Sequence, residues 1–411
     1  MARNKLSTES YKGVRDFYPE DQALERYLFD TMRKTAESFG YVEYGASILE
    51  PAELYVSKTS EEIVSEQTYT FTDRGGREVT LRPEMTPTLA RMVAAKRREL
   101  AFPLRWYSIP NIFRYERPQR GRLREHWQLN CDLFGVAGPE AEAEIITLAY
   151  RLMKNFGAAD TDFEIHLNSR VALNTLFRGY GLTEAQTKKL RLLVDKKDKM
   201  PATDFDAAAM DIVGKPFVLR ALEDKNLDAL TSMLETVGIT NVKRDPTLVR
   251  GFDYYTGMVF EVFDASPKNN RSLFGGGRYD NLLELFGSDT IPAVGFGMGD
   301  VTTRDFLEIH GLLPELPSTT NLAICTVEPS AIPGAQAIAH ELRKLGVNVV
   351  VNVTDKKVGD QIKTADKQNI PYIICIGEKE MSSRRYVLKN LKSGAERELG
   401  IEEIPAIIGR R

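Results

Sequence analysis

The sequence predicts an α+β protein with a large N-terminal part, a helical insertion and a small C-terminal α/β domain. Three observations support this prediction. The chain has 411 residues, which at roughly 150 residues per domain corresponds to two or three domains. Residues 67–85 have the pattern of a β-hairpin that turns at Gly75 and Gly76. Beyond residues 312–320, a linker with two prolines, strand and helix patterns alternate.

The first elements follow in chain order. Residues 19–40 have helical periodicity, acids in the first turn and a glycine at the end, so a helix is expected there. A strand is expected from residue 41 to Pro51, followed by the hairpin of residues 67–85. The next helix is expected to begin at Thr86-Pro87, with Thr86 as the cap and Pro87 as the first helical residue.

Residues 104–117 and 124–135 predict two strands of a second hairpin. In the second strand polar and apolar residues alternate, so its polar side chains share one face: His126, Gln128, Asn130 and Asp132. We expect one face of this hairpin to pack on the core and the other to line a cleft. The side chains expected in the cleft are Arg114, Glu116, Gln128 and Asp132.

The segments after the second hairpin complete the expected order of helices and strands. Residues 171–243 have the pattern of a helical insertion, and strand signals return at residues 247–263. Two glycine-rich segments follow, "LFGGGRYDNLLELFG" and "IPAVGFGMGD". In the C-terminal domain, strands are expected at 321–327, 347–353 and 371–377, and helices at 338–346 and 359–370.

Composition excludes several classes of protein. The apolar fraction of 42% is ordinary for a soluble protein, and no apolar run reaches the ~20 residues of a membrane span. The N-terminus has no signal-peptide core, so the cytoplasm is the expected location. Three scattered cysteines predict neither disulfides nor a zinc site, and no metal-binding residues are predicted from spacing.

Positive charge is concentrated in one region of a chain whose net charge is only -3. Residues 91–130 contain ten Lys or Arg and three acids, and five of these arginines lie within residues 113–124. A local cationic region in a balanced protein indicates a site for an anionic ligand. Because arginine binds phosphate oxygens bidentately, Arg114 and Arg122, with Glu116, indicate phosphoryl-type chemistry. The alternative is a solvated basic hairpin.

Other motifs leave two readings open. In "TLRPEMTP", Glu84 beside Arg82 either receives a ligand ammonium group or belongs to a helix cap. In "VRGFDYY", Arg250, Tyr254 and Tyr255 suit the binding of a polar planar ligand. In the alternative reading, one tyrosine packs in the hydrophobic core and the other lies at the edge of the core. The glycine-rich segments permit close approach of a ligand or of a neighbouring strand, and neither has a P-loop or Rossmann signature.

The order of these segments resembles that of histidyl-tRNA synthetases, a family of class II aminoacyl-tRNA synthetases. The segments that carry the resemblance are "YTFTDRGGREVTLRPEMTP", "FRYERPQRGRLREHWQLNCDLFG", "LVRGFDYYTGMVFEVF", "GGGRYD" and "AVGFGMG". It extends from about Tyr11 to the C-terminus. The segment "RGFDYY" is specific to the family, whereas the arginine-rich hairpin is shared by class II enzymes.

The resemblance implies a catalytic domain at residues 1–317, built on an antiparallel sheet flanked by helices, with the helical insertion at about 171–243. It also implies an α/β anticodon-binding domain at residues 318–411. The implied reaction is the ATP-dependent attachment of L-histidine to tRNA(His) through a histidyl-adenylate, with Mg2+ accompanying ATP. A homodimer is implied as well, with the segment around Pro51 at the subunit interface.

The resemblance also assigns roles to individual residues. The implied ATP-binding residues are Arg114, Glu116, Arg122 and Arg250, of which Arg114 and Arg250 act on the α-phosphate and are catalytic. The implied histidine-binding residues are Glu84, Thr86 and Gln128 for the ammonium group, and Asp132 and Tyr255 for the imidazole, with Tyr254 beside them. The tRNA acceptor end would meet Gln119, Arg120 or Arg124.

The most serious departure of the sequence from the family pattern lies at Thr302. Thr302 stands where a family arginine would stack on adenine, and Arg304 or Arg278 would have to replace that arginine. Two other functions therefore stay open. One is a catalytically inactive paralogue that acts as the regulatory subunit of ATP phosphoribosyltransferase, and the other is a tRNA-binding module without chemistry.

Overall fold

The computed structural model describes residues 6–56, 67–117, 119, 121–197, 200–220, 224–249, 254–269 and 271–409. The chain divides into two units between Leu313 and Pro314, a position inside the expected linker. Each unit has its own sheet and its own hydrophobic core.

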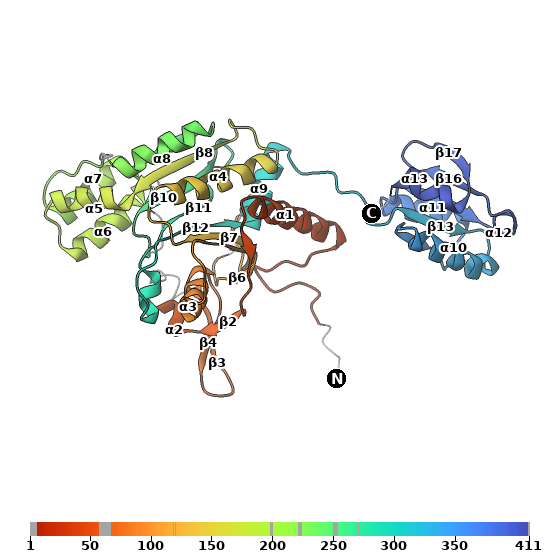
Figure 1. The fold of residues 1–411 in the computed structure, drawn as a ribbon, viewed down its shortest axis with the longest axis horizontal. Coiled ribbons are helices and arrows are strands. Elements are labelled where there is room, and N and C mark those ends of the chain that lie inside the picture. The colour runs from red at the N-terminus through yellow and green to blue at the C-terminus, as the bar shows by residue number, and fades with distance from the viewer. Residues whose placement is uncertain are drawn as a thin grey trace. The chain divides into compact units, whose positions relative to one another are not determined.

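The first unit is built on a nine-stranded sheet (Figure 1). Its strands lie in the order β1 (Val42–Glu43), β5 (Leu104–Ser108), β7 (Glu125–Phe134), β12 (Ala293–Gly299), β11 (Ser272–Arg278), β10 (Met258–Asp264), β8 (Phe163–Ser169) and β9 (Val242–Arg244), and β6 (Asn111–Phe113) also pairs with β7. The strands from β5 to β8 are antiparallel, whereas the edge pairs β1–β5 and β8–β9 are parallel. The predicted α+β class is confirmed.

Helices cover one face of this sheet: α1 (Pro19–Ser38), α4 (Glu140–Asn155), α8 (Lys225–Thr236) and α9 (Asp300–His310) (Figure 1). Helix α1 has proline and two acids in its first turn, and its buried residues Leu24, Leu28 and Met32 recur at helical spacing. Leu28 and Met32 belong to the core that includes Leu129 and Leu133 of β7. The apolar residues of β7 therefore face the helices, as the alternation predicts.

The opposite face of the sheet is covered differently. Helix α3 (Thr86–Lys96) and the 3-10 helix η3 (Leu282–Phe286) pack there with Tyr254 and Tyr255. A small sheet of β2 (Leu49–Pro51), β4 (Glu78–Leu81) and β3 (Tyr69–Thr72) and the short helix α2 (Glu53–Val56) lie in the same part of the unit (Figure 1). The expected cap at Thr86 is wrong by one position, because Thr86 is already helical and Met85 precedes it.

The arginine-rich hairpin forms as predicted, but its first strand is interrupted. Strands β5 and β6 both pair with β7, and Ile109 and Pro110 separate them. Proline has no backbone N–H to donate, so an unbroken ladder through Pro110 is excluded. Its carbonyl still accepts a hydrogen bond from the backbone N–H of Gln128 at 3.0 Å.

Helices follow one another between β8 and β9, as the sequence predicts. They are α5 (Arg170–Gly179), α6 (Glu184–Val194) and α7 (Ala202–Val213), followed by α8. Helices α5 to α7 share a separate apolar cluster around Phe177 and Phe205. Helix α8 instead joins the main core through Leu230 and Leu234.

The second unit has a five-stranded sheet in the order β14 (Val349–Val351), β13 (Leu322–Thr326), β15 (Tyr372–Ile376), β16 (Tyr386–Asn390) and β17 (Glu396–Leu399). The first three strands are parallel and the last two are antiparallel. Its helices are α10 (Ile332–Lys344), α11 (Val358–Lys367), α12 (Glu378–Ser383) and α13 (Ile404–Ile408), with short 3-10 turns η4 (Pro329–Ala331) and η5 (Ile401–Glu403). None of the helices formed by the described residues has the length and apolarity that crossing a bilayer requires.

Candidate active site

A patch of glycines lies on the face of the central sheet that points away from α1 and α4. Gly295 and Gly297 of β12 pair with Asp132 and Asn130 of β7, and on their other side with Gly277 and Gly275 of β11. Directly opposed residues point to the same face, so these four glycines leave an area of sheet without side chains. Such an area lets neighbouring side chains and a ligand lie against the backbone.

Three of the predicted histidine-binding residues lie over these glycines. A Cβ atom on Gly297 would come within 2.8 Å of the Gln128 amide group. One on Gly295 would lie 2.1 Å from Oδ1 of Asp132, and one on Gly277 would lie 3.0 Å from the ring of Tyr255. No side chain fits at these positions without displacing a neighbour, so the glycines create the space that Gln128, Asp132 and Tyr255 occupy.

Asp132 is a buried carboxylate with one satisfied oxygen. The Tyr279 hydroxyl donates a hydrogen bond to Oδ1, whereas Oδ2 has no hydrogen-bond partner among the described residues. Burial raises the pKa of Asp132 to about 7, although the hydrogen bond from Tyr279 acts in the opposite direction. Oδ2 is therefore available to a ligand N–H on the glycine face.

Glu84 forms the second acidic group of the site. Its side chain is only 3% exposed, and Oε2 accepts a hydrogen bond from the Tyr254 hydroxyl at 3.1 Å. The Tyr254 ring lies 4.9 Å from the Tyr255 ring and 5.8 Å from the Tyr279 ring, measured between centroids. The packed rings of Tyr254 and Tyr279 therefore connect Glu84 to Asp132.

Arg82 has a structural role beside Glu84. Its buried guanidinium donates to the carbonyl of Ala46 at 3.0 Å and to the carbonyl and side chain of Asn111 at 2.8 and 2.9 Å. These bonds tie the segment before α3 to β6. Of the two open readings of this motif, the arrangement favours a buried acid in the site, because Glu84 is buried beside the Tyr254 hydroxyl and Met85 occupies the cap position.

Arg114 extends from the end of β6 toward the same acid. Its Nε donates to the carbonyl of Pro83, the residue before Glu84, at 2.7 Å.

Burial, together with the charges of Arg114 and Arg15, lowers the pKa of His126 to about 3. His126 is therefore a neutral ring beside the guanidinium. We did not assign it to the site from the sequence, although the alternation in β7 places it on the same face as Gln128.

Other predicted residues lie at the tip of the hairpin. Gln119 and Arg122 exchange backbone hydrogen bonds of 3.1 and 2.9 Å around Gly121, whose φ of 76° suits glycine. Arg122 is exposed, and its Nη1 lies 3.5 Å from Oε2 of Glu116. Gln119 is exposed as well.

Arg124 is not part of this exposed tip. It is 8% exposed, stacks on the Tyr115 ring at 3.9 Å, and donates to the Tyr11 hydroxyl and the carbonyl of Lys12. Its guanidinium therefore attaches the hairpin to the N-terminal segment, a role that the sequence did not suggest.

The remaining predicted positions are Thr86, Arg120 and Arg250. Thr86, the first residue of α3, is half-buried. Arg120 and Arg250 lie outside the described residues. Within the described part of the chain, no group of three or more His, Cys, Asp or Glu residues is placed to hold a metal ion.

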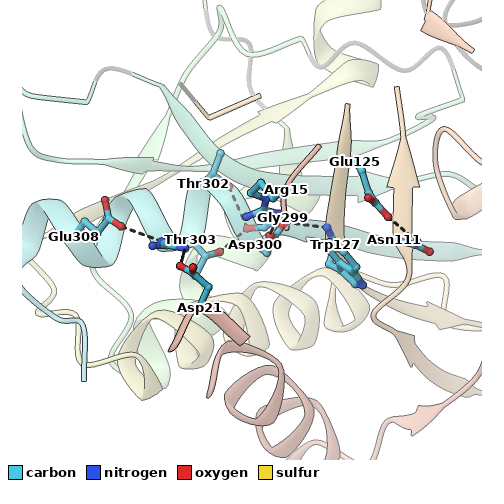
Figure 2. A network of polar contacts seen from close by, with 11 residues as sticks. Arg15, Asp21, Asn111, Glu125, Trp127, Gly299, Asp300, Thr302, Thr303 and Glu308 are labelled. Carbon is cyan, nitrogen blue, oxygen red and sulfur yellow. Dashed lines mark hydrogen bonds and ion pairs between the residues drawn. The ribbon is translucent and has the colours of Figure 1, made fainter. Parts of the chain in front are cut away.

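Neither arginine considered as a replacement at Thr302 reaches the glycine patch. Arg304 pairs with Glu308 at 3.0 Å and with Asp21 of α1 at 3.3 Å, on the helix side of the sheet. Figure 2 shows Asp21 and Glu308 there, with Asp300 between Arg15 and the backbone of Trp127. Arg278 is buried in an ion pair with Glu142 of α4. Both guanidinium groups are thus committed elsewhere.

Comparisons with known proteins agree with this geometry. The model of a family described as "Histidyl-tRNA synthetase" matches residues 13–299, and that of an "Anticodon binding domain" matches residues 321–411. A histidine--tRNA ligase of Leptospira biflexa is 42% identical over 96% of this chain and 95% of its own length. One from Thermoplasma volcanium is 36% identical over 95% and 96%.

A solved structure has the same fold. The histidyl-tRNA synthetase from Nostoc sp. PCC 7120 superimposes with a TM-score of 0.80 over 98% of this chain and 99% of that one, at 23% sequence identity. At that identity the likeness concerns the fold alone.

Proposed function

The chain belongs to the histidyl-tRNA synthetase family, and from this premise we propose that it attaches L-histidine to tRNA(His) in an ATP-dependent reaction through a histidyl-adenylate. The observation that carries the proposal is that two buried acids, Glu84 and Asp132, are linked through the neighbouring rings of Tyr254 and Tyr279, with Asp132 lying on the glycine patch. One acid suits the ammonium group of histidine, and the other suits an N–H of its imidazole ring.

The regulatory-subunit alternative is not favoured. The curated relatives named above are histidine--tRNA ligases over nearly their whole length, and an anticodon-binding domain follows the catalytic part. A binding module without chemistry would have no use for a buried amino-acid pocket beside Arg114. We assign residues 1–317 to catalysis, including the insertion at about 171–243, and residues 318–411 to anticodon binding.

Histidine is proposed to lie over the glycine patch. Its ammonium group binds Glu84, assisted by Thr86 and Gln128, and its imidazole donates an N–H to Oδ2 of Asp132. Tyr255 serves the other ring nitrogen, with Tyr254 beside it. The support for this orientation is the burial of Glu84 and the Oδ2 atom of Asp132, which none of the described residues binds. An amino acid without ring nitrogens would leave these buried groups unpaired, which is costly and so gives selectivity.

ATP is proposed to bind beside the ammonium site. Arg114 is anchored on the Pro83 carbonyl, one residue from Glu84, so its guanidinium can hold the α-phosphate near the histidine carboxylate. Arg250 is proposed to act on the same phosphate, Arg122 on the outer phosphates, and Glu116 near the adenine. Mg2+ is proposed to accompany ATP.

The proposed chemistry needs no protein nucleophile. A carboxylate oxygen of histidine attacks the α-phosphorus of ATP, the bond to the bridging oxygen breaks, and pyrophosphate leaves. A ribose hydroxyl of the terminal adenosine of tRNA then attacks the carbonyl of the adenylate, and AMP leaves. The arginines stabilise negative charge as it builds on the phosphate, and the fixed pocket positions the two reactants.

The proposal also includes contacts with tRNA and with a second subunit. Gln119, which is exposed, and Arg120 of the same loop are proposed to contact the acceptor end, and Arg124 contributes by holding the hairpin against the N-terminal segment. A homodimer is proposed with the segment around Pro51 at its interface, where Leu49 and Phe71 of the small sheet are exposed. The cytoplasm is the proposed location.

Charging assays test this function. The protein is incubated with ATP, Mg2+, labelled histidine and tRNA(His), and we expect label in tRNA. A tRNA of another specificity and a reaction without ATP are the controls. Failure to charge tRNA(His) under conditions in which a known histidine--tRNA ligase does so would contradict the proposal.

A further inference from the structure

Two of the three cysteines of the chain meet in the sheet of the second unit. Cys325 of β13 and Cys375 of β15 lie far apart in the sequence, but they are direct partners in the register of these two parallel strands. Both are free thiols in this structure. Neighbouring strands lie about 4.8 Å apart, a spacing within the range of about 4.4–6.8 Å that disulfides span between Cα atoms.

The two cysteines lie on the face of the sheet that helix α11 covers. Ala323 and Ile373, two residues before Cys325 and Cys375, pack in one apolar cluster with Ala365 of α11. Alternate residues of a strand share a face, so both thiols lie on this side of the sheet as well. Cys325 is 1% exposed there, whereas Cys375 is only partly buried.

Cys375 is accessible from the neighbouring strand. That strand is β16, whose Lys389 pairs with Ile373 and therefore shares the face of Cys375. Val387, two residues before Lys389, lies on the same face and is 45% exposed. The sheet beside Cys375 is thus in contact with solvent, and a small thiol reagent can reach Cys375 from this side. Cys325 lies one strand further in.

The surroundings of the two thiols make them unequal. A hydrogen bond from the Cys325 thiol is the main reason that the pKa of Cys375 is lowered; the charge of Lys389 adds to it, and burial, Glu380 and Glu396 oppose it. The same hydrogen bond, together with burial, raises the pKa of Cys325. The thiolate is the nucleophilic form of cysteine, so Cys375 is the thiol that attacks first.

We propose that Cys325 and Cys375 form a reversible dithiol–disulfide couple that reacts with a low-molecular-weight disulfide such as oxidised glutathione. The couple lies in the second unit and does not depend on the reaction proposed for the first. Reduced glutathione or another thiol in excess reverses it.

The reaction proceeds by two thiol–disulfide exchanges. The Cys375 thiolate attacks one sulfur of the oxidant, the S–S bond breaks, and one glutathione thiolate leaves with the electron pair. Cys325 then loses its proton, attacks the Cys375 sulfur of the mixed disulfide and displaces the second glutathione thiolate. The protein loses two protons and two electrons, and oxidised glutathione becomes two molecules of reduced glutathione.

Oxidation of the whole chain by oxidised glutathione tests the couple. We expect the number of free thiols, counted by alkylation in denaturant, to fall from three to one, and the mass of the protein to fall by that of two hydrogen atoms. A peptide map should contain one pair of peptides joined through Cys325 and Cys375, and dithiothreitol should restore every thiol. Cys131→Ala is the matched control, because it removes the cysteine of the first unit and should lose two thiols as the wild type does.

Single variants test the order of the two exchanges. In Cys325→Ala the mixed disulfide has no second thiol to resolve it, so we expect one glutathione to remain on Cys375. In Cys375→Ala the buried Cys325 should acquire glutathione at least about tenfold more slowly. Circular dichroism checks the fold of each variant, and the measurements on the wild type stand without them.

Several outcomes would overturn the inference. Three free thiols after treatment of the wild type would do so, as would a disulfide that joins two chains or one that involves Cys131. Glutathione that stays on Cys375 of the wild type would show that Cys325 does not resolve it. Charging of tRNA is not measured here, so failure of this couple is distinguished from failure of the proposed function.

Discussion

The Tyr279 hydroxyl donates a hydrogen bond to Oδ1 of Asp132, across strands β11, β12 and β7. The two residues are 147 positions apart in the sequence and are both buried. The bond fixes the carboxylate against Gly295 and leaves Oδ2 without a partner among the described residues. A buried carboxylate with one fixed and one open oxygen is suited to recognising a ligand N–H.

Asp132 is expected to make histidine recognition depend on pH. Its pKa in the free protein is about 7, so the carboxylate forms as the pH rises through that value. We expect kcat/KM for histidine to increase across this range, because the carboxylate is the better acceptor for the imidazole N–H. The Asp132→Asn variant should lose this step and lower kcat/KM at pH 8 by at least about tenfold.

The ionisation of the substrate is controlled in the same experiment. Histidine titrates identically with both proteins, so only the difference between their pH profiles of pyrophosphate exchange reports on Asp132. Profiles of the same shape would show that another group controls recognition.

The glycine patch is expected to be required for activity more than for stability. In Gly295→Ala the new methyl group would overlap Oδ1 of Asp132 and displace the carboxylate. We expect kcat/KM for histidine to fall at least about tenfold, since the lost contact is a buried, charged hydrogen bond. Gly179→Ala in α5 is the matched control, because a Cβ there meets no atom within 4 Å. Equal activity of the two variants would contradict the role assigned to the patch.

Glu25 of α1 is expected to make the stability of the first unit decrease at alkaline pH. Burial and the neighbouring Asp300 raise the pKa of Glu25 to about 8. The folded protein therefore binds this proton more tightly than the unfolded chain, whose pKa is near 4.5. The resulting stabilisation is complete below pH 4.5 and is lost as the pH rises through 8.

The Glu25→Gln variant isolates this effect. Glutamine stays neutral, so its Tm should decline less than that of the wild type between pH 6 and pH 9. Glu20→Gln, at the exposed start of the same helix, controls for the loss of one negative charge. Tm curves of the wild type and Glu25→Gln that stay parallel over this range would rule out a buried proton on Glu25.

Arg250 is expected to act in the chemical step. Arg250→Ala should lower the rate of adenylate formation about a hundredfold or more, because it removes charge stabilisation in the transition state. Histidine binding should change far less. Pre-steady-state adenylate formation and equilibrium binding of histidine measure the two quantities separately. Equal losses in both would mean that Arg250 contributes to the amino-acid pocket instead.

The sequence predicted the parts of the site that depend on local periodicity. Alternation in β7 placed Gln128 and Asp132 on one face, and the structure gathers both over the glycine patch. The sequence could not predict the hydrogen bond from Tyr279 to Asp132, because that contact depends on the register of three strands. For the same reason the glycines at 275 and 297 were recognised as permissive, but not as a continuous surface.

Other features required tertiary contacts that no local pattern contains. Arg124 was expected with Gln119 and Arg120 at the tRNA acceptor end, yet it is buried against the N-terminal segment whereas Arg122 is exposed. In the second unit, strands β16 and β17 were not predicted. Strand β16 has only two buried apolar residues, Tyr386 and Leu388, and β17 is charged and mostly exposed, so the period-two pattern is too short to identify either strand.

The most direct test of the central claim is ATP–pyrophosphate exchange measured with each of the twenty amino acids. The account predicts exchange that depends on histidine and is near background with the other nineteen, because only histidine satisfies both Glu84 and Asp132. Exchange supported equally by an amino acid without ring nitrogens, or by none, would contradict the claim that this pocket selects and activates histidine.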